Sequence, residues 1–269
     1  MITRTKTNRI DNLFAKLKEN KKSALMPYLM AGYPDIETSL RLLVAAARAG
    51  ADLVEFGIPY SDPLADGPTI QVASEIALKN KINTDVVFEL VRKARKETDI
   101  PIVIMTYYNT VYRYGMDRFA KNAAECGADG VITPDLPPEE AGPWKEVALK
   151  HGLATVMLAA PTSTNERLKK ISEASQGFVY CVSLTGVTGA RDNLPVNLTD
   201  FISRIRNITD KPLAVGFGIS RPEQASQIAK IADGVIIGSA LVNLIGKNKG
   251  SCIEAATAYI SEIRQAMDN

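Results

Sequence analysis

The sequence has few of the residues that build disulfides, metal sites or catalytic triads. It contains three cysteines and a single histidine among 269 residues. Cys126, Cys181 and Cys252 lie far apart and form no C-x-x-C pair, which indicates free thiols in a reducing compartment. His151 stands alone between a predicted helix and a predicted strand. A histidine-activated serine or cysteine is therefore excluded, and a histidine-based metal site is disfavoured.

Long apolar segments and charge of one sign are also missing. The longest apolar runs are of strand length, and the first residues, MITRTKTNRIDNLF, lack the apolar core of a signal peptide. Lysine and arginine number 32 against 30 aspartate and glutamate, and the basic clusters fall on helical patterns, which indicates solvated helix faces. We therefore expect a soluble, cytoplasmic protein that binds neither membranes nor nucleic acid.

What the sequence does have is a regular alternation of apolar strands and amphipathic helices. Apolar residues at helical spacing over 8–20 predict a helix that lies across one end of the domain. Strands that are apolar on nearly every residue are buried on both faces, and alternation with helices makes them parallel. The predicted strands, each followed by a helical pattern, are 24–32, 51–57, 101–107, 130–134, 153–159, 177–183, 213–218 and 234–239.

Two architectures contain such strands: an open doubly wound sheet and a closed barrel. An open sheet would carry a G-x-G-x-x-G fingerprint after its first strand, but that turn reads MAGYPD. Eight strand-helix units in roughly 250 residues are typical of the (β/α)8 barrel. No linker or low-complexity segment divides the chain. The sequence therefore predicts a single-domain TIM barrel over 1–269 with an extra N-terminal helix.

The stretch 51–68, ADLVEFGIPYSDPLADGP, changes from an apolar strand to a loop fixed by proline and glycine. Side chains alternate along a strand, so Glu55 shares a face with Leu53 and stands at the carboxyl end, and Asp66 follows on the loop. Active sites of such barrels lie at this end, which favours catalytic roles. Two plainer interpretations stay open: Glu55 could only accept backbone hydrogen bonds, and Asp66 could only cap a turn or helix.

The predicted rim restricts the chemistry further. No strand contains a lysine, which argues against a Schiff base, so acid-base chemistry by carboxylates and tyrosines remains. The apolar strand around Glu55 is expected to raise its pKa toward neutrality, where an acid-base group works best. The residues placed at or just beyond the same rim are Tyr28, Tyr107, Asp135, Tyr180, Gly189, Gly218 and Ser239.

The loops after the last three strands are rich in glycine. They read SLTGVTGAR, GFGISRP and IGSALVNLIG, and the third places Gly238 and Ser239 at the start of the final helix. Backbone amides in such loops and at helix N-termini attract anions, and TIM barrels build their phosphate sites here. We therefore expect an enzyme that acts on a small phosphorylated substrate by carboxylate acid-base catalysis, without metal or Schiff base.

Several motifs, in this order, resemble the tryptophan synthase α chain family: MPYLMAGYPD (26–35), FGIPYSDPLADGP (56–68), PDLPPEE (134–140), SLTGVTGAR (183–191), GFGIS and IGSA. The resemblance extends from about residue 10 to the C-terminus. It implies retro-aldol cleavage of indole-3-glycerol phosphate to indole and glyceraldehyde 3-phosphate in tryptophan biosynthesis. Protonation of the indole ring at C3 would then replace the electron sink that other aldolases obtain from lysine or zinc.

The resemblance also implies roles for individual residues. Glu55 matches the general acid-base glutamate, and Asp66 matches an aspartate near the indole N–H whose charge stabilises the positive ring nitrogen. Thr188 matches a residue of a loop that closes over the site. The residues that match pocket-lining or loop-ordering positions are Tyr28, Tyr107, Asp135 and Tyr180. Those that match phosphate-binding positions are Gly189, Gly218, Gly238 and Ser239.

A partner is implied as well. The family's α chain binds a pyridoxal-phosphate-dependent β chain in an α2β2 assembly and needs no cofactor of its own, and the loop 58–68 and the segment 137–143 would lie at or near the contact. Two alternatives stay open: a stand-alone lyase that releases free indole, and a non-catalytic subunit that binds a phosphorylated ligand and regulates its partner. Glu55 and Asp66 argue against the second, because a binding module needs no carboxylate buried beside an apolar substrate.

Overall fold

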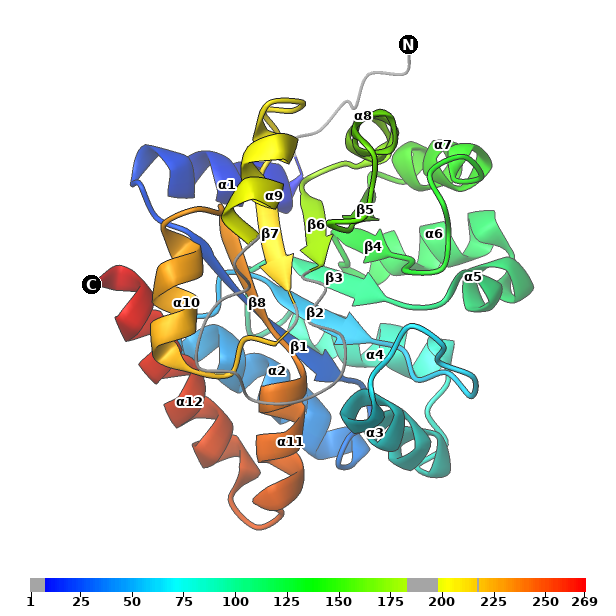
Figure 1. Ribbon diagram of the computed structural model, residues 1–269. Helices are drawn as coiled ribbons and strands as arrows, with labels where there is room; N and C mark the ends of the chain where they lie inside the picture. Colours follow the sequence, from blue (N-terminus) through cyan, green and yellow to red (C-terminus); the bar gives the residue numbers. More distant parts are fainter. Residues whose placement is uncertain (1–7, 183–197, 217) are drawn as a thin grey trace.

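In the computed structural model, parallel strands close into a barrel that is surrounded by helices (Figure 1). The structure describes residues 8–182, 198–216 and 218–269. Strands pair in chain order, and β8 closes the barrel on β1. The predicted TIM barrel is therefore confirmed. Within the described residues the strands are β1 Ala24–Met30, β2 Val54–Gly57, β3 Ile102–Met105, β4 Gly130–Ile132, β5 Ala154–Ala159, β6 Val179–Val182, β7 Leu213–Gly216 and β8 Gly234–Ile237.

The helices form the outer layer and one end of the barrel (Figure 1). No described helix combines the length and the apolar character that a membrane span requires. In the same residues the helices are α1 Arg9–Glu19, α2 Ile36–Arg48, α3 Pro68–Lys79, α4 Thr84–Ala94, α5 Tyr108–Tyr114, α6 Met116–Cys126, α7 Gly142–Lys150, α8 Asn165–Ala174, α9 Leu198–Arg206, α10 Pro222–Ala229, α11 Ser239–Lys247 and α12 Cys252–Asp268.

One predicted element is wrong. The helix that begins at Ser239 is not the final helix, because it ends at Lys247 and α12 follows. Asn248 caps α11, and the chain turns through Gly250 before α12 begins. Helix α12 packs against α2, α10 and α11.

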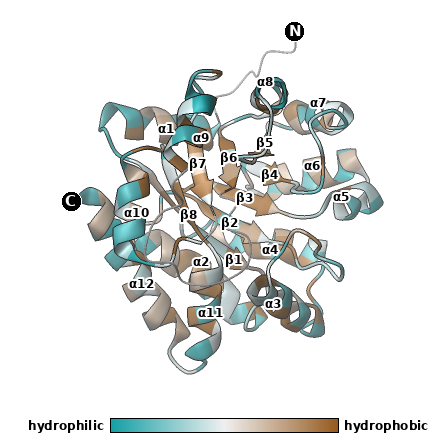
Figure 2. Ribbon diagram, viewed as in Figure 1, coloured by the Kyte–Doolittle hydropathy of each residue, from teal (hydrophilic) through white to brown (hydrophobic). Residues whose placement is uncertain are grey.

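The strands of the barrel are largely apolar (Figure 2). Their buried side chains belong to two clusters, one beneath the helices and one inside the barrel. Outward-facing Val54 and Phe56 of β2 pack under the helices, whereas Leu53 belongs to the barrel interior together with Met26 and Val103. This is the predicted alternation of the second strand. Glu55, which follows Leu53 on the same face, therefore points into the barrel.

Helix α1 closes the end of the barrel where the strands begin (Figure 1). Its apolar face places Ile10, Phe14 and Leu17 in the barrel interior, and the rings of Phe14 and Phe178 lie 5.8 Å apart. Glycine is needed beneath this helix, because a Cβ atom at Gly177 would lie 2.9 Å from Cγ2 of Ile10. The predicted N-terminal helix is thus confirmed, and the opposite end of the barrel is left to form a site.

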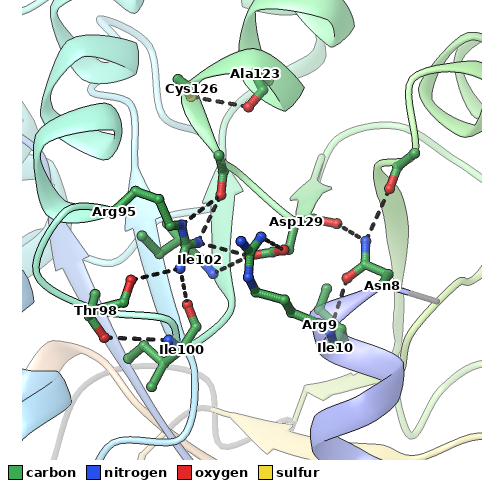
Figure 3. Close-up of polar contacts among 12 residues, drawn as sticks. Asn8, Arg9, Ile10, Arg95, Thr98, Ile100, Ile102, Ala123, Cys126 and Asp129 are labelled. Atoms are coloured by element: carbon green, nitrogen blue, oxygen red, sulfur yellow. Dashed lines mark hydrogen bonds and ion pairs between the residues drawn. The ribbon is translucent and has the colours of Figure 1, made fainter. Parts of the chain in front are cut away.

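At this end of the barrel, a buried carboxylate forms hydrogen bonds that connect several elements (Figure 3). Asp129, just before β4, is 4% exposed, and its carboxylate accepts hydrogen bonds from Arg95 Nη2 at 3.0 Å, Arg9 Nη1 at 3.0 Å and Ile102 N at 2.9 Å. The side chain of Asn8, which caps α1, donates to the Asp129 carbonyl at 2.6 Å. Asp129 therefore joins α1, the end of α4 and two neighbouring strands.

We expect Asp129→Ala to lower the free energy of unfolding by about 3–5 kcal/mol, because it leaves the largely buried Arg95 guanidinium without its charge partner. Urea unfolding followed by fluorescence of the buried Trp144 measures this loss. The matched control is Glu97→Ala, which removes an ion pair with Arg48 whose side chains are more than half exposed, and we expect it to cost less than about 1 kcal/mol. If both variants lost the same free energy of unfolding, the Asp129 network would not stabilise the barrel as described.

Candidate active site

A cavity of about 290 Å³ lies at the carboxyl ends of the strands. Its lining combines two carboxylates, aromatic and aliphatic side chains, and two glycine-containing loops. Such a lining suits a small ligand with an apolar body and a charged end. The described lining residues are Tyr28, Glu55, Asp66, Gly67, Thr69, Ile70, Met105, Tyr180, Gly218, Ile219, Ser220, Ile236, Gly238, Ser239, Ala240 and Asn243.

Glu55 is the most buried polar group of this cavity. It stands on β2 between Tyr28 of β1 and Val103 of β3, and its side chain is fully buried. Neither carboxylate oxygen has a hydrogen-bond partner among the described residues, so these residues do not support the interpretation of Glu55 as a backbone acceptor. Loss of hydration raises the pKa of Glu55 to about 8. Glu55 is therefore protonated at neutral pH and is able to donate a proton.

Asp66 is a second carboxyl group with a different environment. Partial burial raises its pKa to about 6, and a hydrogen bond from the Tyr107 hydroxyl opposes this rise by stabilising the charged form. Asp66 is accordingly ionised at pH 7 while Glu55 is neutral. No side chain caps α3, so Asp66 does not act as its helix cap. Two carboxyl groups whose pKa values are pushed apart are typical of an acid paired with an electrostatic stabiliser.

The loop that carries Asp66 is fixed from two sides. Ser74 on α3 accepts from the Tyr60 amide and donates to the Tyr60 carbonyl, both at 2.9 Å. The Ala65 amide donates to the Tyr107 hydroxyl at 2.8 Å, and the rings of Tyr60 and Tyr107 stack with centroids 4.9 Å apart. Tyr107 is therefore placed among the residues that order this loop, one of the two roles that the resemblance allows it.

Asp135 also lies beside the site without lining the cavity. Its carboxylate accepts from the Tyr108 amide at 2.8 Å, at the start of α5. A carboxylate at a helix N-terminus satisfies an otherwise unpaired amide and complements the helix dipole. Asp135 thus connects the loop after β4 to the loop after β3.

Tyr28 and Tyr180 line the cavity directly, and each ring covers a glycine on the neighbouring strand. A Cβ atom at Gly57 would lie 2.2 Å from the Tyr28 hydroxyl oxygen, and one at Gly216 would lie 2.5 Å from that of Tyr180. Burial raises the pKa of both phenols well above 10, so they remain neutral. These two tyrosines form rigid walls whose position depends on the two glycines.

The glycine-containing loops bring backbone amides to the cavity. Gly218 has φ +78°, and Gly238 is the N-cap of α11 without a side-chain cap. The amides of Gly218 and Ile219 donate no hydrogen bond to another described residue, and Ser239 begins the first turn of α11, where amides have no partner within the helix. Tyr107 and Asp135 lie beside the cavity, and Thr188 and Gly189 lie outside the described residues. The other site residues predicted from the sequence line the cavity: Tyr28, Glu55, Asp66, Tyr180, Gly218, Gly238 and Ser239.

Several lining residues were missed by the sequence prediction. Thr69 and Ile70 begin α3, Met105 ends β3, and Ser220 follows Gly218. Asn243 could have been found, because it lies one helical turn after Ser239 and therefore shares its face. The aliphatic residues carry no such signal, since the barrel contains many similar side chains.

Neither His151 nor any of the three cysteines is among the described residues that line the cavity. His151 follows α7 and its ring contacts Asp117 Oδ1 at 3.0 Å, away from the cavity. The three cysteines are free thiols, as predicted, and all three are buried. Within residues 8–182, 198–216 and 218–269, no three histidine, cysteine or carboxylate side chains are grouped as a metal site.

We expect Gly57→Ala to weaken substrate binding. The added Cβ would lie 2.2 Å from the hydroxyl oxygen of Tyr28 and 2.8 Å from its Cζ, so the whole ring must move. The measurement is the KM for substrate, with a rise of about tenfold corresponding to about 1.4 kcal/mol. The control is Gly142→Ala on α7, where no atom lies within 4 Å of the added Cβ. An unchanged KM in Gly57→Ala would show that the Tyr28 wall is not positioned in this way.

Comparison with known proteins identifies the family. The model of the tryptophan synthase alpha chain family matches residues 14–268. The tryptophan synthase alpha chain of Geotalea daltonii is 50% identical over 234 residues, covering 87% of this chain and 89% of the relative. That of Aquifex aeolicus is 48% identical over 261 residues, covering 96% and 98%.

Solved structures agree in fold. The crystal structure of tryptophan synthase subunit alpha from Legionella pneumophila superposes with a TM-score of 0.92 at 43% identity, covering 98% of this chain and 100% of that one. A structure of Mycobacterium tuberculosis tryptophan synthase gives a TM-score of 0.90 at 40% identity, covering 97% and 99%. The chain belongs to the tryptophan synthase alpha chain family.

Proposed function

We propose that Glu55 and Asp66 carry out the proton transfer and charge stabilisation of this chain's reaction. The chain is a lyase, the tryptophan synthase α subunit, which cleaves indole-3-glycerol phosphate in tryptophan biosynthesis. One observation above all supports the role of Glu55: its carboxyl group is fully buried in the cavity and has no hydrogen-bond partner in the described part of the chain. This burial raises the pKa of Glu55 to about 8.

The reaction needs one proton delivered and one removed. Protonated Glu55 donates to C3 of the indole ring, which leaves a positive charge on the ring nitrogen, and ionised Asp66 stabilises that charge. Glu55, now a carboxylate, accepts the proton of the substrate hydroxyl. The bond between C3 and the glycerol carbon breaks, its electron pair returns to the ring, and an aldehyde forms. Glu55 ends protonated again, so the cycle closes without an outside reactant.

The remaining lining suits the two ends of this substrate. Ile70, Met105 and the rings of Tyr28 and Tyr180 offer an apolar slot for indole. The amides around Gly218 and the first turn of α11, with Gly238 and Ser239, suit the phosphate. Thr188 and Gly189 keep the roles that the resemblance assigns to them, closure over the site and phosphate binding.

The protonated ring accepts the electron pair of the breaking bond, so the chemistry asks for no other electron sink. We accordingly propose that this chain uses no cofactor of its own and that pyridoxal phosphate belongs to the β chain. A cytoplasmic location is part of the same proposal.

A β chain as partner in an α2β2 assembly completes the proposal. The loop between β2 and α3 supports it, because Leu64 is 95% exposed at the tip of a loop that hydrogen bonds hold in place. A partner that covers this side chain would remove its apolar surface from water, which favours association. The chain is also similar to a chain in the structure of Mycobacterium tuberculosis tryptophan synthase.

We expect Glu55→Gln to lower kcat for indole release from indole-3-glycerol phosphate by about 10²–10⁴-fold, because glutamine keeps the shape of the side chain and cannot transfer the proton. Indole is measured with the purified chain, alone and with a tryptophan synthase β chain. The matched control is Glu75→Gln on α3, whose carboxylate is largely exposed and pairs with Lys79. The control should keep the activity of the unmodified chain.

The same assay separates the alternatives. A rise in activity on adding the β chain supports the subunit assignment, whereas full activity alone with no response supports a stand-alone lyase. Retention of activity in Glu55→Gln would contradict the proposed mechanism. Substrate binding without any indole from the unmodified chain would support a non-catalytic subunit.

A further inference from the structure

Gly218, Ile219 and Ser220 of the loop 218–221 line the cavity, and a buried side chain binds two amides of this loop. Gln224, the third residue of α10, is only 7% exposed. Its Oε1 accepts from the Ser220 amide at 3.0 Å, the Arg221 amide at 3.1 Å and the Ser220 hydroxyl at 3.4 Å. A single carboxamide oxygen thus collects the donors of two consecutive residues.

These bonds decide which amides remain for a ligand. The amides of Ser220 and Arg221 are turned toward Gln224, whereas those of Gly218 and Ile219 donate to no other described residue. Gly218, at φ +78°, adopts the left-handed conformation that reverses the direction of successive amides. Among the described residues, the change from amides without a partner to amides bound by Gln224 therefore falls between Ile219 and Ser220, which both line the cavity.

A second contact holds the loop through a carbonyl group instead of an amide. The Tyr259 hydroxyl, on α12, donates to the Ser220 carbonyl at 3.1 Å. Helix α12 packs against both α10 and α11, the two helices whose first turns border the cavity loops. Both backbone groups of Ser220 therefore have a partner: its amide donates to Gln224, and its carbonyl accepts from Tyr259.

We propose that Gln224 is a positioning residue for phosphate recognition, which holds the loop 218–221 so that the Gly218 and Ile219 amides meet the substrate phosphate together with the first turn of α11. Tyr259 supports the same geometry through Ser220. This inference rests on the proposed phosphate site. It adds to that site the buried side chain of Gln224, which does not itself touch the phosphate. Preorganised donors bind an anion without the cost of ordering them.

The test separates binding of the phosphate from binding of the ring. We expect Gln224→Leu to raise the Kd for glycerol 3-phosphate, measured by calorimetry, by about tenfold, and Tyr259→Phe to raise it by about threefold, since one neutral hydrogen bond is lost. The Kd for indole, which has no phosphate, should change less than twofold. With substrate, KM should rise while kcat stays within about twofold, a split that loss of folding alone does not produce.

The control is Gln227→Leu, an exposed position on the same helix, which should leave both Kd values unchanged. Urea midpoints for each variant establish that it is folded, and if Gln224→Leu fails to fold, Tyr259→Phe alone decides. Unchanged glycerol 3-phosphate binding in the folded variants would overturn the role of Gln224. If Ser239→Asp, which places a negative charge at the first turn of α11, also leaves that binding unchanged, the phosphate site itself is wrong.

Discussion

The structure depends on the removal of one carboxyl group from water. Glu55 is fully buried, and desolvation is the cause of its raised pKa. Its folded pKa of about 8 exceeds the ordinary value of 4.5, so folding keeps a proton that the unfolded chain loses as the pH rises between these values. This contribution to stability is complete below pH 4.5 and declines as the pH rises toward 8. The barrel thus gives up stability at neutral pH to keep an acid in the cavity.

The other parts of the site maintain this environment. Helix α1 and the interior layer with Leu53 and Met26 fill the barrel beneath Glu55 and exclude water from that side. Tyr28 and Tyr180 lie over glycines of the neighbouring strands, and both side chains are buried. Polar side chains such as Tyr107 and Gln224 bind loop backbone, so the loops carrying Asp66 and the cavity amides keep their shape. Tyr107 and Gln224 therefore act on the loops and not on the ligand.

The sequence predicts the parts that follow from local pattern. Buried strands alternate with helices, which fixes the barrel, and side-chain alternation places Glu55 inside it. Two kinds of feature were not predictable: the hydrogen bonds between residues far apart in the sequence, and the turn that separates α11 from α12. The Ala65 amide meets Tyr107 across 42 positions, and Arg9 meets Asp129 across 120. No periodicity encodes such pairs, and α12 was missed because a turn at Gly250 interrupts an otherwise continuous helical pattern.

The measurement that tests this account most directly is the protonation state of Glu55. Infrared difference spectra between the unmodified chain and Glu55→Gln, recorded from pH 5 to 10, isolate the carboxyl stretch of this one group. We predict a protonated carboxyl at pH 7 that ionises with an apparent pKa of about 8. An ionised Glu55 at pH 6 would contradict the account, because it could then no longer deliver the first proton to the indole ring.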